Sequence, residues 1–295
     1  MVIFGVLLPQ DGKTYVEIAE TAKVAETLGF NSFWLFDHFM PFTFGKKKDY
    51  LESWTTLSAL ASETSSIRLG ILVSCSSYRN PALLTKMAST LDVLSKGRLE
   101  FGIGAGWYRE EYEAYGYPFP KAGVRITQLR EAISIIKGLW TTTSFTFEGQ
   151  YYKVKDAICE PKPVQQPHPP ILIGGNKRKM LKLMAEKADI ANFGFKIAGL
   201  NKTLKTLDDF CRVAGRAPST LVKSYTGVCL IDKGLLKMFL GTPHLDVVVA
   251  GSPKHCADKI DKLVMRGFTY IILYFVGKDR LKAMEVFAKE VMSVF

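Results

Sequence analysis

The sequence predicts an α/β protein folded as a single (β/α)8 barrel over residues 1–295, with insertions at the carboxyl ends of its strands. Short apolar runs alternate with amphipathic helical patterns along the whole chain. Eight such runs occur, which is the number that closes a barrel. A length of 295 residues fits one barrel of about 250 residues plus insertions, and no linker or repeat divides the chain. An open doubly wound sheet is the alternative architecture.

The eight predicted strands are short and mostly apolar rather than alternating. This pattern is typical of parallel strands that are buried on both faces. In chain order the predicted strands are Ile3–Leu8, Phe33–Phe36, Ile67–Val73, Leu99–Gly104, Ile171–Gly174, Ile190–Phe193, Val222–Ile231 and Tyr270–Phe275.

Helices between the strands are predicted from apolar residues at three- and four-residue spacing, which lie on one face of a helix. We expect each of these faces to pack against the barrel. The three clearest stripes are Leu83, Met87, Leu91 and Leu94; Ile126, Leu129, Ile133, Ile136 and Trp140; and Leu281, Met284, Ala288, Val291 and Phe295.

Two segments interrupt the regular alternation. A hairpin is predicted around Phe145 to Val154, with Glu148-Gly149 in its turn. The segment from Gly234 to Val249 is a second, irregular insertion. Prolines from Pro161 to Pro170 predict an extended connection, because proline removes a helix donor and extends the residue before it. Insertions at strand carboxyl ends are expected to build the substrate pocket.

Composition excludes several classes of protein. No window approaches the ~18 consecutive apolar residues of a membrane span. The chain starts directly with a strand and its five cysteines are scattered, so a cytoplasmic protein with reduced thiols and no structural metal is expected. The net charge of +11 indicates either a lysine-rich surface or attraction for an anionic ligand. Lysines spread over most helices argue against a nucleic-acid face.

Strand carboxyl ends carry the candidate chemistry. The second strand ends in Asp37-His38, where a carboxylate beside an imidazole suits proton transfer; a capping aspartate beside a packed histidine is the alternative. The third strand leads into Ser74-Cys75, whose small side chains suit contact with a planar ring. A nucleophilic Cys75 is disfavoured, because the sequence offers it no evident histidine partner.

Glycines mark two ligand-facing turns. Gly102, Gly104 and Gly106 lead from the fourth strand into a helix whose first turn holds Glu110 and Glu111, and a tight turn that binds nothing is the alternative. The fifth strand ends in Gly174-Gly175-Asn176-Lys177, followed by a helix. Free backbone N–H groups and a helix N-terminus there predict a phosphate site, the alternative being a Gly-Gly turn with solvated basic residues.

These motifs together resemble the bacterial-luciferase-like superfamily of flavin- and deazaflavin-dependent oxidoreductases, over nearly the whole chain. Within that superfamily, the segments 104–108 and 115–120 resemble the branch that uses coenzyme F420. The segments that carry the resemblance are Phe36-Asp37-His38-Phe39, Ile67-Arg68-Leu69-Gly70, Tyr78–Leu84, Ala88–Leu99, Gly102–Trp107, Pro161–Gln165, Pro167–Gly175 and Gly251-Ser252-Pro253.

The resemblance implies a bacterial-luciferase-like barrel with the cofactor ring at the strand carboxyl ends. It implies catalytic roles for Asp37 and His38, a phosphate turn at Gly174-Gly175, and a non-prolyl cis peptide at Ser74-Cys75. The implied substrate pocket contains Phe42 and Trp107. The implied cofactor-binding residues are Asp37, Ser74, Cys75, Gly106, Glu110, Gly174, Gly175, Asn176 and Lys177.

Trp107 is a departure from the resemblance. The F420-dependent sugar-phosphate dehydrogenases of the superfamily carry a glutamate there, and tryptophan cannot protonate a substrate. A sugar phosphate is therefore disfavoured as substrate, and His38 remains the protic candidate.

Three functions are carried forward from the sequence. The first is hydride transfer between F420 and a small organic substrate. The second is an FMN-dependent monooxygenase supplied by a partner flavin reductase, and the third is a non-catalytic flavin-binding barrel. The resemblance also implies a homodimer, and the apolar stripes leave aromatic residues such as Trp54 and Tyr78 to bury.

Overall fold

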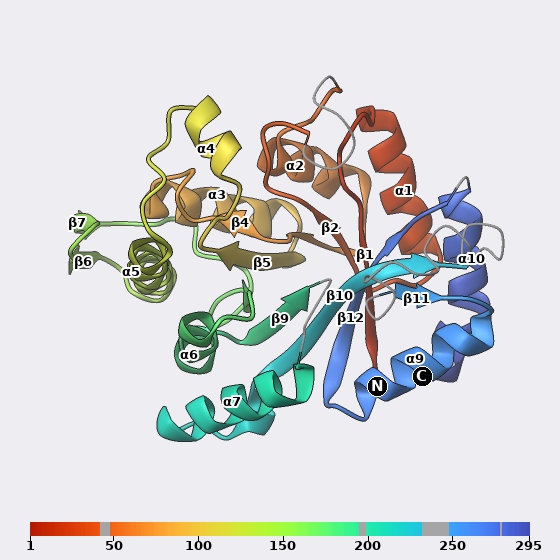
Figure 1. The fold of residues 1–295 in the computed structure, drawn as a ribbon. Coiled ribbons are helices and arrows are strands. Elements are labelled where there is room, and N and C mark those ends of the chain that lie inside the picture. The colour runs from red at the N-terminus through yellow and green to blue at the C-terminus, as the bar shows by residue number, and fades with distance from the viewer. Residues whose placement is uncertain (42–47, 195–198, 232–247, 278) are drawn as a thin grey trace.

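The computed structural model describes the chain apart from residues 42–47, 195–198, 232–247 and 278. Parallel strands form a closed ring, and helices lie around it (Figure 1). Ring closure is completed where β10 pairs with both β9 and β12. The ring strands are β1 Ile3–Leu7, β2 Ser32–Leu35, β3 Arg68–Ile71, β5 Leu99–Gly104, β8 Ile171–Gly174, β9 Ile190–Gly194, β10 Val222–Leu230 and β12 Phe268–Phe275.

The predicted (β/α)8 barrel is confirmed, and each predicted strand corresponds to one strand of the ring. Parallel register brings Gly5 of β1 opposite Ser32 of β2, and Ile3 opposite Tyr270 of β12. Two short strands were not predicted: β4, Ser74–Cys75, pairs with β5, and β11, Val248–Ala250, pairs with β10. Because all ring strands run in the same direction, their carboxyl ends gather at one mouth of the barrel.

Polar caps fix where several helices begin. Thr14 and Glu17 form a capping box at α1, and Asn80 caps α3 with Pro81 in its first position. The α-helices are α1 Tyr15–Thr27, α2 Ser53–Glu63, α3 Pro81–Leu94, α4 Arg109–Ala114, α5 Ala122–Thr141, α6 Arg178–Lys187, α7 Leu200–Val213, α9 Pro253–Val264 and α10 Arg280–Glu290; the 3-10 helices are η1 Pro218–Thr220 and η3 Met292–Val294.

The core lies both inside the ring and between the ring and the helices. Inside, Trp34 fills the barrel against Gly70, where a Cβ atom would lie 2.4 Å from the indole ring. Outside, the predicted face of α5 is confirmed, with Ile133 and Ile136 fully buried. The predicted face of α3 is partly wrong, because Leu83 is 55% exposed. Leu84, Ala88 and Leu91 form the buried face of α3 instead, while Leu94 is 59% exposed.

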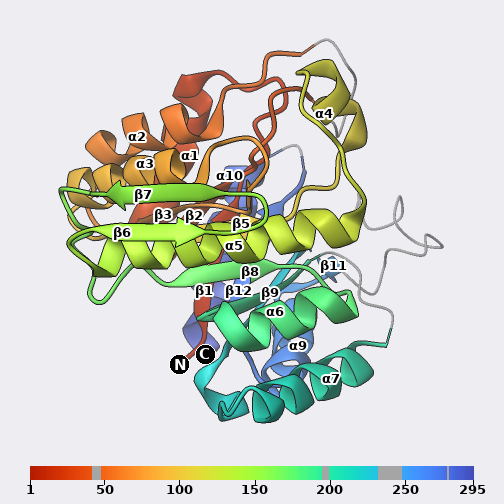
Figure 2. The ribbon, with the colours of Figure 1, turned by 90° about the vertical axis from the view of Figure 1, so that its left-hand side faces the viewer.

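The first predicted insertion is confirmed as a hairpin. Strand β6, Phe145–Glu148, pairs antiparallel with β7, Lys153–Ala157, outside the barrel beside α5 (Figure 2). Glu131 of α5 accepts three backbone N–H bonds from residues 150–152 and so fastens the hairpin turn. Most of the second insertion, from Gly234 to Val249, lies outside the described residues.

Trp54 and Tyr78 are buried in the chain's own interior, at 3% and 6% exposure. They therefore offer no argument for a partner subunit, and the homodimer stays a prediction. In the described part of the chain, no helix has both the length and the apolar character needed to span a bilayer.

Candidate active site

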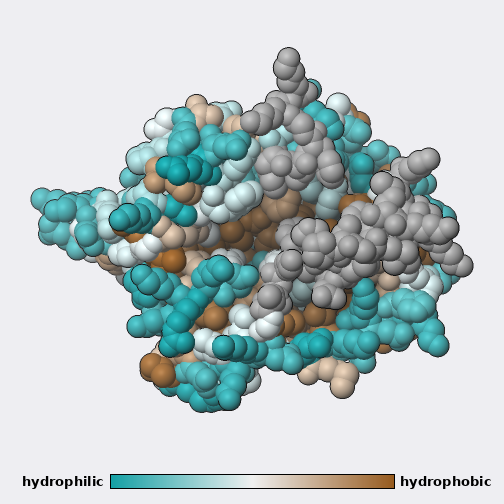
Figure 3. All heavy atoms as spheres, in the orientation of Figure 1, coloured by the Kyte–Doolittle hydropathy of each residue, from teal (hydrophilic) through white to brown (hydrophobic). Residues whose placement is uncertain are grey.

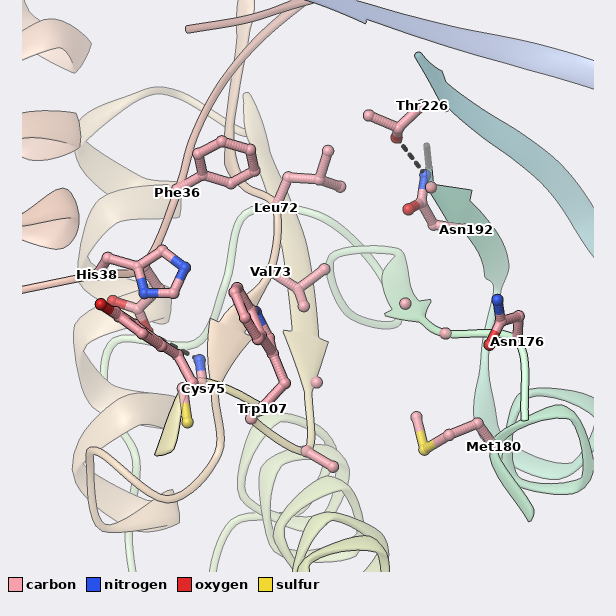
Figure 4. A pocket seen from close by; sticks show the side chains of 18 of the residues that line it. Phe36, His38, Leu72, Val73, Cys75, Trp107, Asn176, Met180, Asn192 and Thr226 are labelled. Atoms are coloured by element: carbon pink, nitrogen blue, oxygen red, sulfur yellow. Dashed lines mark hydrogen bonds between the residues drawn. The ribbon is translucent and has the colours of Figure 1, made fainter. Parts of the chain in front are cut away.

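A cavity of about 670 Å³ opens at the carboxyl ends of the strands, where ligands bind in barrels of this kind. Figure 3 shows a hollow with a hydrophobic floor on the face seen in Figure 1. Close up, Phe36, His38 and Trp107 lie on one side of the cavity, while Asn176 and Met180 lie on the other (Figure 4). We call these the histidine side and the glycine side, the latter also including Gly174 and Gly175.

Asp37 accepts hydrogen bonds from several elements on the histidine side. Arg79 donates to both of its carboxylate oxygens, at 2.8 and 3.0 Å. Ser53 Oγ and the Cys75 N–H also donate to it, at 2.9 and 2.8 Å. Burial lowers the pKa of Arg79, but the charges of Asp37 and Glu52 outweigh that effect and raise it. This network ties the end of β2 to β4, α2 and the start of α3.

His38 follows Asp37 and meets a carboxylate from a distant part of the chain. Its Nδ1 lies 2.9 Å from Oε2 of Glu111 in α4. The hydroxyl of Tyr78 donates to the same oxygen, and the N–H groups of Phe39 and Met40 donate to Oε1. Burial raises the pKa of Glu111, but the bonds from His38, Tyr78 and Phe39 outweigh it and hold that pKa below its usual value. Glu111 is therefore an anion held by donors.

Aromatic rings frame the imidazole of His38. Trp107 and Tyr108 meet it edge to face, with ring centroids 5.9 and 5.8 Å away. Phe36 meets it from a third direction, at 6.2 Å. Trp107 is 63% exposed and stacks on Tyr108, so it stands at the rim of the cavity. Aromatic rings thus surround the His38 imidazole, and Glu111 is the buried anion that contacts it.

The glycine side is shaped by missing side chains. A Cβ atom at Gly174 would lie 3.4 Å from Val73, an ordinary contact, so the fold does not require glycine there. Gly175 has φ +141°, a conformation that favours glycine. Helix α6 begins at Arg178 with no side-chain cap, which leaves its first-turn N–H groups to an anion. Lys177 adds a positive charge beside this turn.

Most predicted site residues come together around this cavity. Ser74 and Glu110 do not line it: Ser74 is buried, and Glu110 is exposed on α4 near the Tyr108 hydroxyl. Phe42 lies outside the described residues. The predicted residues that line the cavity are Asp37, His38, Cys75, Gly106, Trp107, Gly174, Gly175, Asn176 and Lys177.

The structure corrects one expectation near Cys75 and agrees with another. The non-prolyl cis peptide joins Leu72 to Val73, so its placement at Ser74-Cys75 was wrong by two residues. Burial raises the pKa of the Cys75 thiol to about 12, and the thiol lies 3.0 Å from the Tyr112 hydroxyl. A protonated, buried thiol suits a packing role rather than a nucleophilic one.

Sequence reasoning missed several polar residues at the site. Arg79 lies in a matched motif and Glu111 in the helix that follows another, but nothing in the sequence pairs them with Asp37 and His38. Asn192 lines the cavity and donates to Ser224 and Thr226, at 3.0 and 2.9 Å (Figure 4). Among the described residues no cluster of histidine, cysteine and carboxylate side chains suits a metal ion.

Comparisons with known proteins identify the family. An uncharacterized protein of Mycobacterium tuberculosis is 33% identical over 214 residues, covering 67% of this chain and 74% of that protein. The F420-dependent glucose-6-phosphate dehydrogenase of Intrasporangium calvum is 26% identical, covering 94% and 93%. The coenzyme F420-dependent tetrahydromethanopterin reductase of Methanopyrus kandleri superposes with a TM-score of 0.85 at 22% identity, covering 100% and 99%. The luciferase-like monooxygenase family model matches residues 3–234, and the chain therefore belongs to that family.

Proposed function

We propose that this protein is an oxidoreductase that transfers a hydride between coenzyme F420 and a small organic substrate. The observation that carries the proposal is one cavity with a carboxylate-held histidine on one side and a glycine-built anion turn on the other. Similarity to F420-dependent dehydrogenases over nearly the full chain supports it.

The residues of the glycine side fit a flat cofactor with an anionic tail. Gly174 and Gly175 leave the cavity wall without side chains, and Val73, which also lines the cavity next to Gly174, would contact a ring bound there. Lys177 and the first turn of α6 would hold a phosphate. When bound, the deazaflavin supplies two-electron hydride chemistry, while the protein supplies binding, orientation and electrostatics.

On the histidine side, His38 exchanges the proton that accompanies the hydride. If a carbonyl is reduced, its carbon gains the hydride and its oxygen gains a proton from the imidazolium, which gives an alcohol. Asp37 does not exchange protons in this proposal, because Arg79, Ser53 and the Cys75 N–H engage its oxygens. It sets the position of His38 through the end of β2.

Trp107 narrows the substrate class. A glutamate in its place would supply a second acid, whereas the indole supplies an apolar surface next to His38. The described lining of the histidine side carries no lysine or arginine that could bind a substrate phosphate. We propose a neutral, partly apolar substrate that needs only one protic group.

FMN-dependent monooxygenation with a partner flavin reductase is the second candidate. The description of the matching family as monooxygenases favours it. The same glycine turn would hold the FMN phosphate. The two candidate functions therefore differ in their chemistry and not in the cofactor-binding site that they require.

The test is to mix the protein with reduced F420 in air, with and without small ketones, enones and quinones. We expect reduced F420 to persist until an acceptor is added and then to be consumed with formation of the reduced acceptor. In a parallel reaction with reduced FMN in place of F420, oxygen-dependent conversion of an added compound to an oxygenated product, with no consumption of F420, would overturn the proposal in favour of the second candidate.

A further inference from the structure

We infer that Glu111 is a positioning residue that keeps Nδ1 of His38 protonated, so that Nε2 is the nitrogen that exchanges protons in the cavity. The inference rests on the proposed function, because it assigns the orientation of the histidine used there. It adds a residue from α4 to the site, and this residue lies 73 positions after His38 in the sequence.

Hydrogen-bond donors surround both carboxylate oxygens of Glu111. Oε1 accepts the N–H groups of Phe39 and Met40, at 2.7 and 3.2 Å. Oε2 accepts the Tyr78 hydroxyl and lies 2.9 Å from Nδ1 of His38. A carboxylate that receives three donors stays ionised, and an ionised carboxylate can only accept. Nδ1 of His38 must therefore carry the proton in that bond.

Glu111 is as buried as any residue in the protein, at 0% exposure. Burial alone would raise its pKa, yet the hydrogen bonds to it lower its pKa overall. The phenol of Tyr78 has a pKa raised well above its usual value by burial and by its bond to Glu111, so it remains a donor. The charge on Glu111 thus faces groups that stabilise it.

The segment just before α3 contributes to the positions of both Asp37 and His38, which follow β2. Tyr78 donates to Glu111, which holds His38, while the adjacent Arg79 donates to Asp37. These two residues immediately precede Asn80, the cap of α3. Rotation of the imidazole would break the bond to Glu111 and displace the ring from its edge-to-face contacts with Trp107 and Tyr108. The arrangement restrains both the tautomer and the orientation of the ring.

This arrangement has a chemical consequence. When a carbonyl is reduced by hydride, the imidazolium gives its Nε2 proton to the substrate oxygen and becomes neutral with Nδ1 still protonated. Glu111 stabilises the imidazolium before transfer and takes up no proton itself, and water then returns a proton to Nε2. A buried carboxylate that orients a histidine acts in the same manner in hydrolase triads.

The test is ring ¹⁵N NMR of the full-length protein, free and with F420 added. The chain has four histidines, so His38 is assigned by its loss in His38→Ala. In the wild type we expect Nδ1 to be protonated. In Glu111→Gln the N–H groups of Phe39 and Met40 hold the amide oxygen, which turns the amide NH2 toward His38. Nδ1 must then accept, and the proton moves to Nε2.

Glu113→Gln is the matched control, because Glu113 lies on the same helix, is exposed and pairs with Arg109. It should leave the His38 spectrum unchanged. An unprotonated Nδ1 in the wild type, or an Nδ1 proton that survives in Glu111→Gln, overturns the inference. If Glu111→Gln does not fold, the wild-type spectrum alone still decides whether Nδ1 is the donor.

Turnover of reduced F420 with a quinone such as menadione gives a second readout. Glu111→Gln should lower kcat by about 10–100-fold, with F420 affinity unchanged, and Glu111→Asp should recover part of the loss. Full kcat in Glu111→Gln together with a low kcat in His38→Ala contradicts the positioning role. Full kcat in His38→Ala instead refutes the proposed function of His38, and the NMR result still decides the Glu111 contact.

Discussion

The two sides of the cavity are built by opposite means. On the histidine side, charged and aromatic side chains position one another. His38 is hydrogen-bonded to Glu111, and Asp37 is hydrogen-bonded to Arg79. On the glycine side the backbone forms the surface, and Gly174 and Gly175 are useful because they carry no side chain. In the proposed function, side-chain networks position the group that transfers the proton, whereas exposed backbone binds the ligand. Substitutions on the histidine side should therefore affect turnover, and substitutions on the glycine side should affect cofactor binding.

The largest expected effect is on turnover. His38→Ala removes the protic group of the histidine side and should lower kcat by about 10²–10⁴-fold. Because His38 is not part of the glycine side, the dissociation constant for F420 should change little. Steady-state kinetics with reduced F420, beside a fluorescence titration of F420, separate the two effects. Turnover within a few-fold of wild type would mean that His38 only packs.

The next effect is on cofactor binding. Gly174→Ala adds a methyl group that the protein itself accommodates, at 3.4 Å from Val73, so only a ligand should be displaced. We expect the dissociation constant of the cofactor to rise by about 5- to 100-fold with an unchanged melting temperature. Gly123→Ala on α5 is the control, since Gly123 does not line the cavity and an added methyl group would make only an ordinary contact with the far end of the Lys179 side chain. Unchanged affinity in Gly174→Ala would remove the glycine side from the site.

Gly174→Ala is a cleaner probe of the glycine side than Gly175→Val. Gly175 has φ +141°, so any other side chain there strains the backbone as well as blocking a ligand. A loss of binding in Gly175→Val would not separate the two causes.

The smallest effect concerns acid stability and should be confined to the histidine side. The folded-state pKa of Glu111 lies below its usual value of 4.5. Its stabilising contribution is therefore present above that value and is lost as pH falls through the folded-state pKa. Glu111→Gln should lower the free energy of unfolding by about 1–3 kcal/mol near neutral pH and by less in acid. Urea titrations across pH measure this difference.

Gly174→Ala provides the contrast for that measurement. No titratable group changes on the glycine side, so any stability difference from wild type should be independent of pH. A Glu111→Gln difference that stays constant into acid would show that the carboxylate is not the source of the stability.

The fold was largely predictable because each buried parallel strand leaves a short apolar run that depends only on local residues. The buried faces of the helices were less predictable from the sequence. On α3 the three-and-four spacing through Leu83 and Leu94 points to a face that is exposed, while Leu84 and Ala88 face the core. The apolar residues on that helix cover more than one face, so their spacing does not single out the buried one.

The candidate site was predictable where it depends on strand ends and not where it depends on distant pairs. Gly174, Gly175 and His38 follow strands, and such positions meet at the mouth of any barrel. Glu111 lies 73 residues from His38, and no local pattern joins them. Glu110 and Glu111 look equivalent in sequence, but adjacent residues on a helix point about 100° apart. One is exposed beside Tyr108, and the other is buried against His38.

We propose that the two sides of this cavity together serve a reaction that depends on a deazaflavin. Parallel titrations of F420 and FMN into wild type and Gly174→Ala test it most directly, followed by chemical reduction of each complex and exposure to air. We expect F420 to bind more tightly than FMN, the glycine substitution to weaken F420 binding, and the reduced F420 complex to be stable in air. Tight FMN binding with rapid reoxidation by oxygen, and no binding of F420, would contradict it.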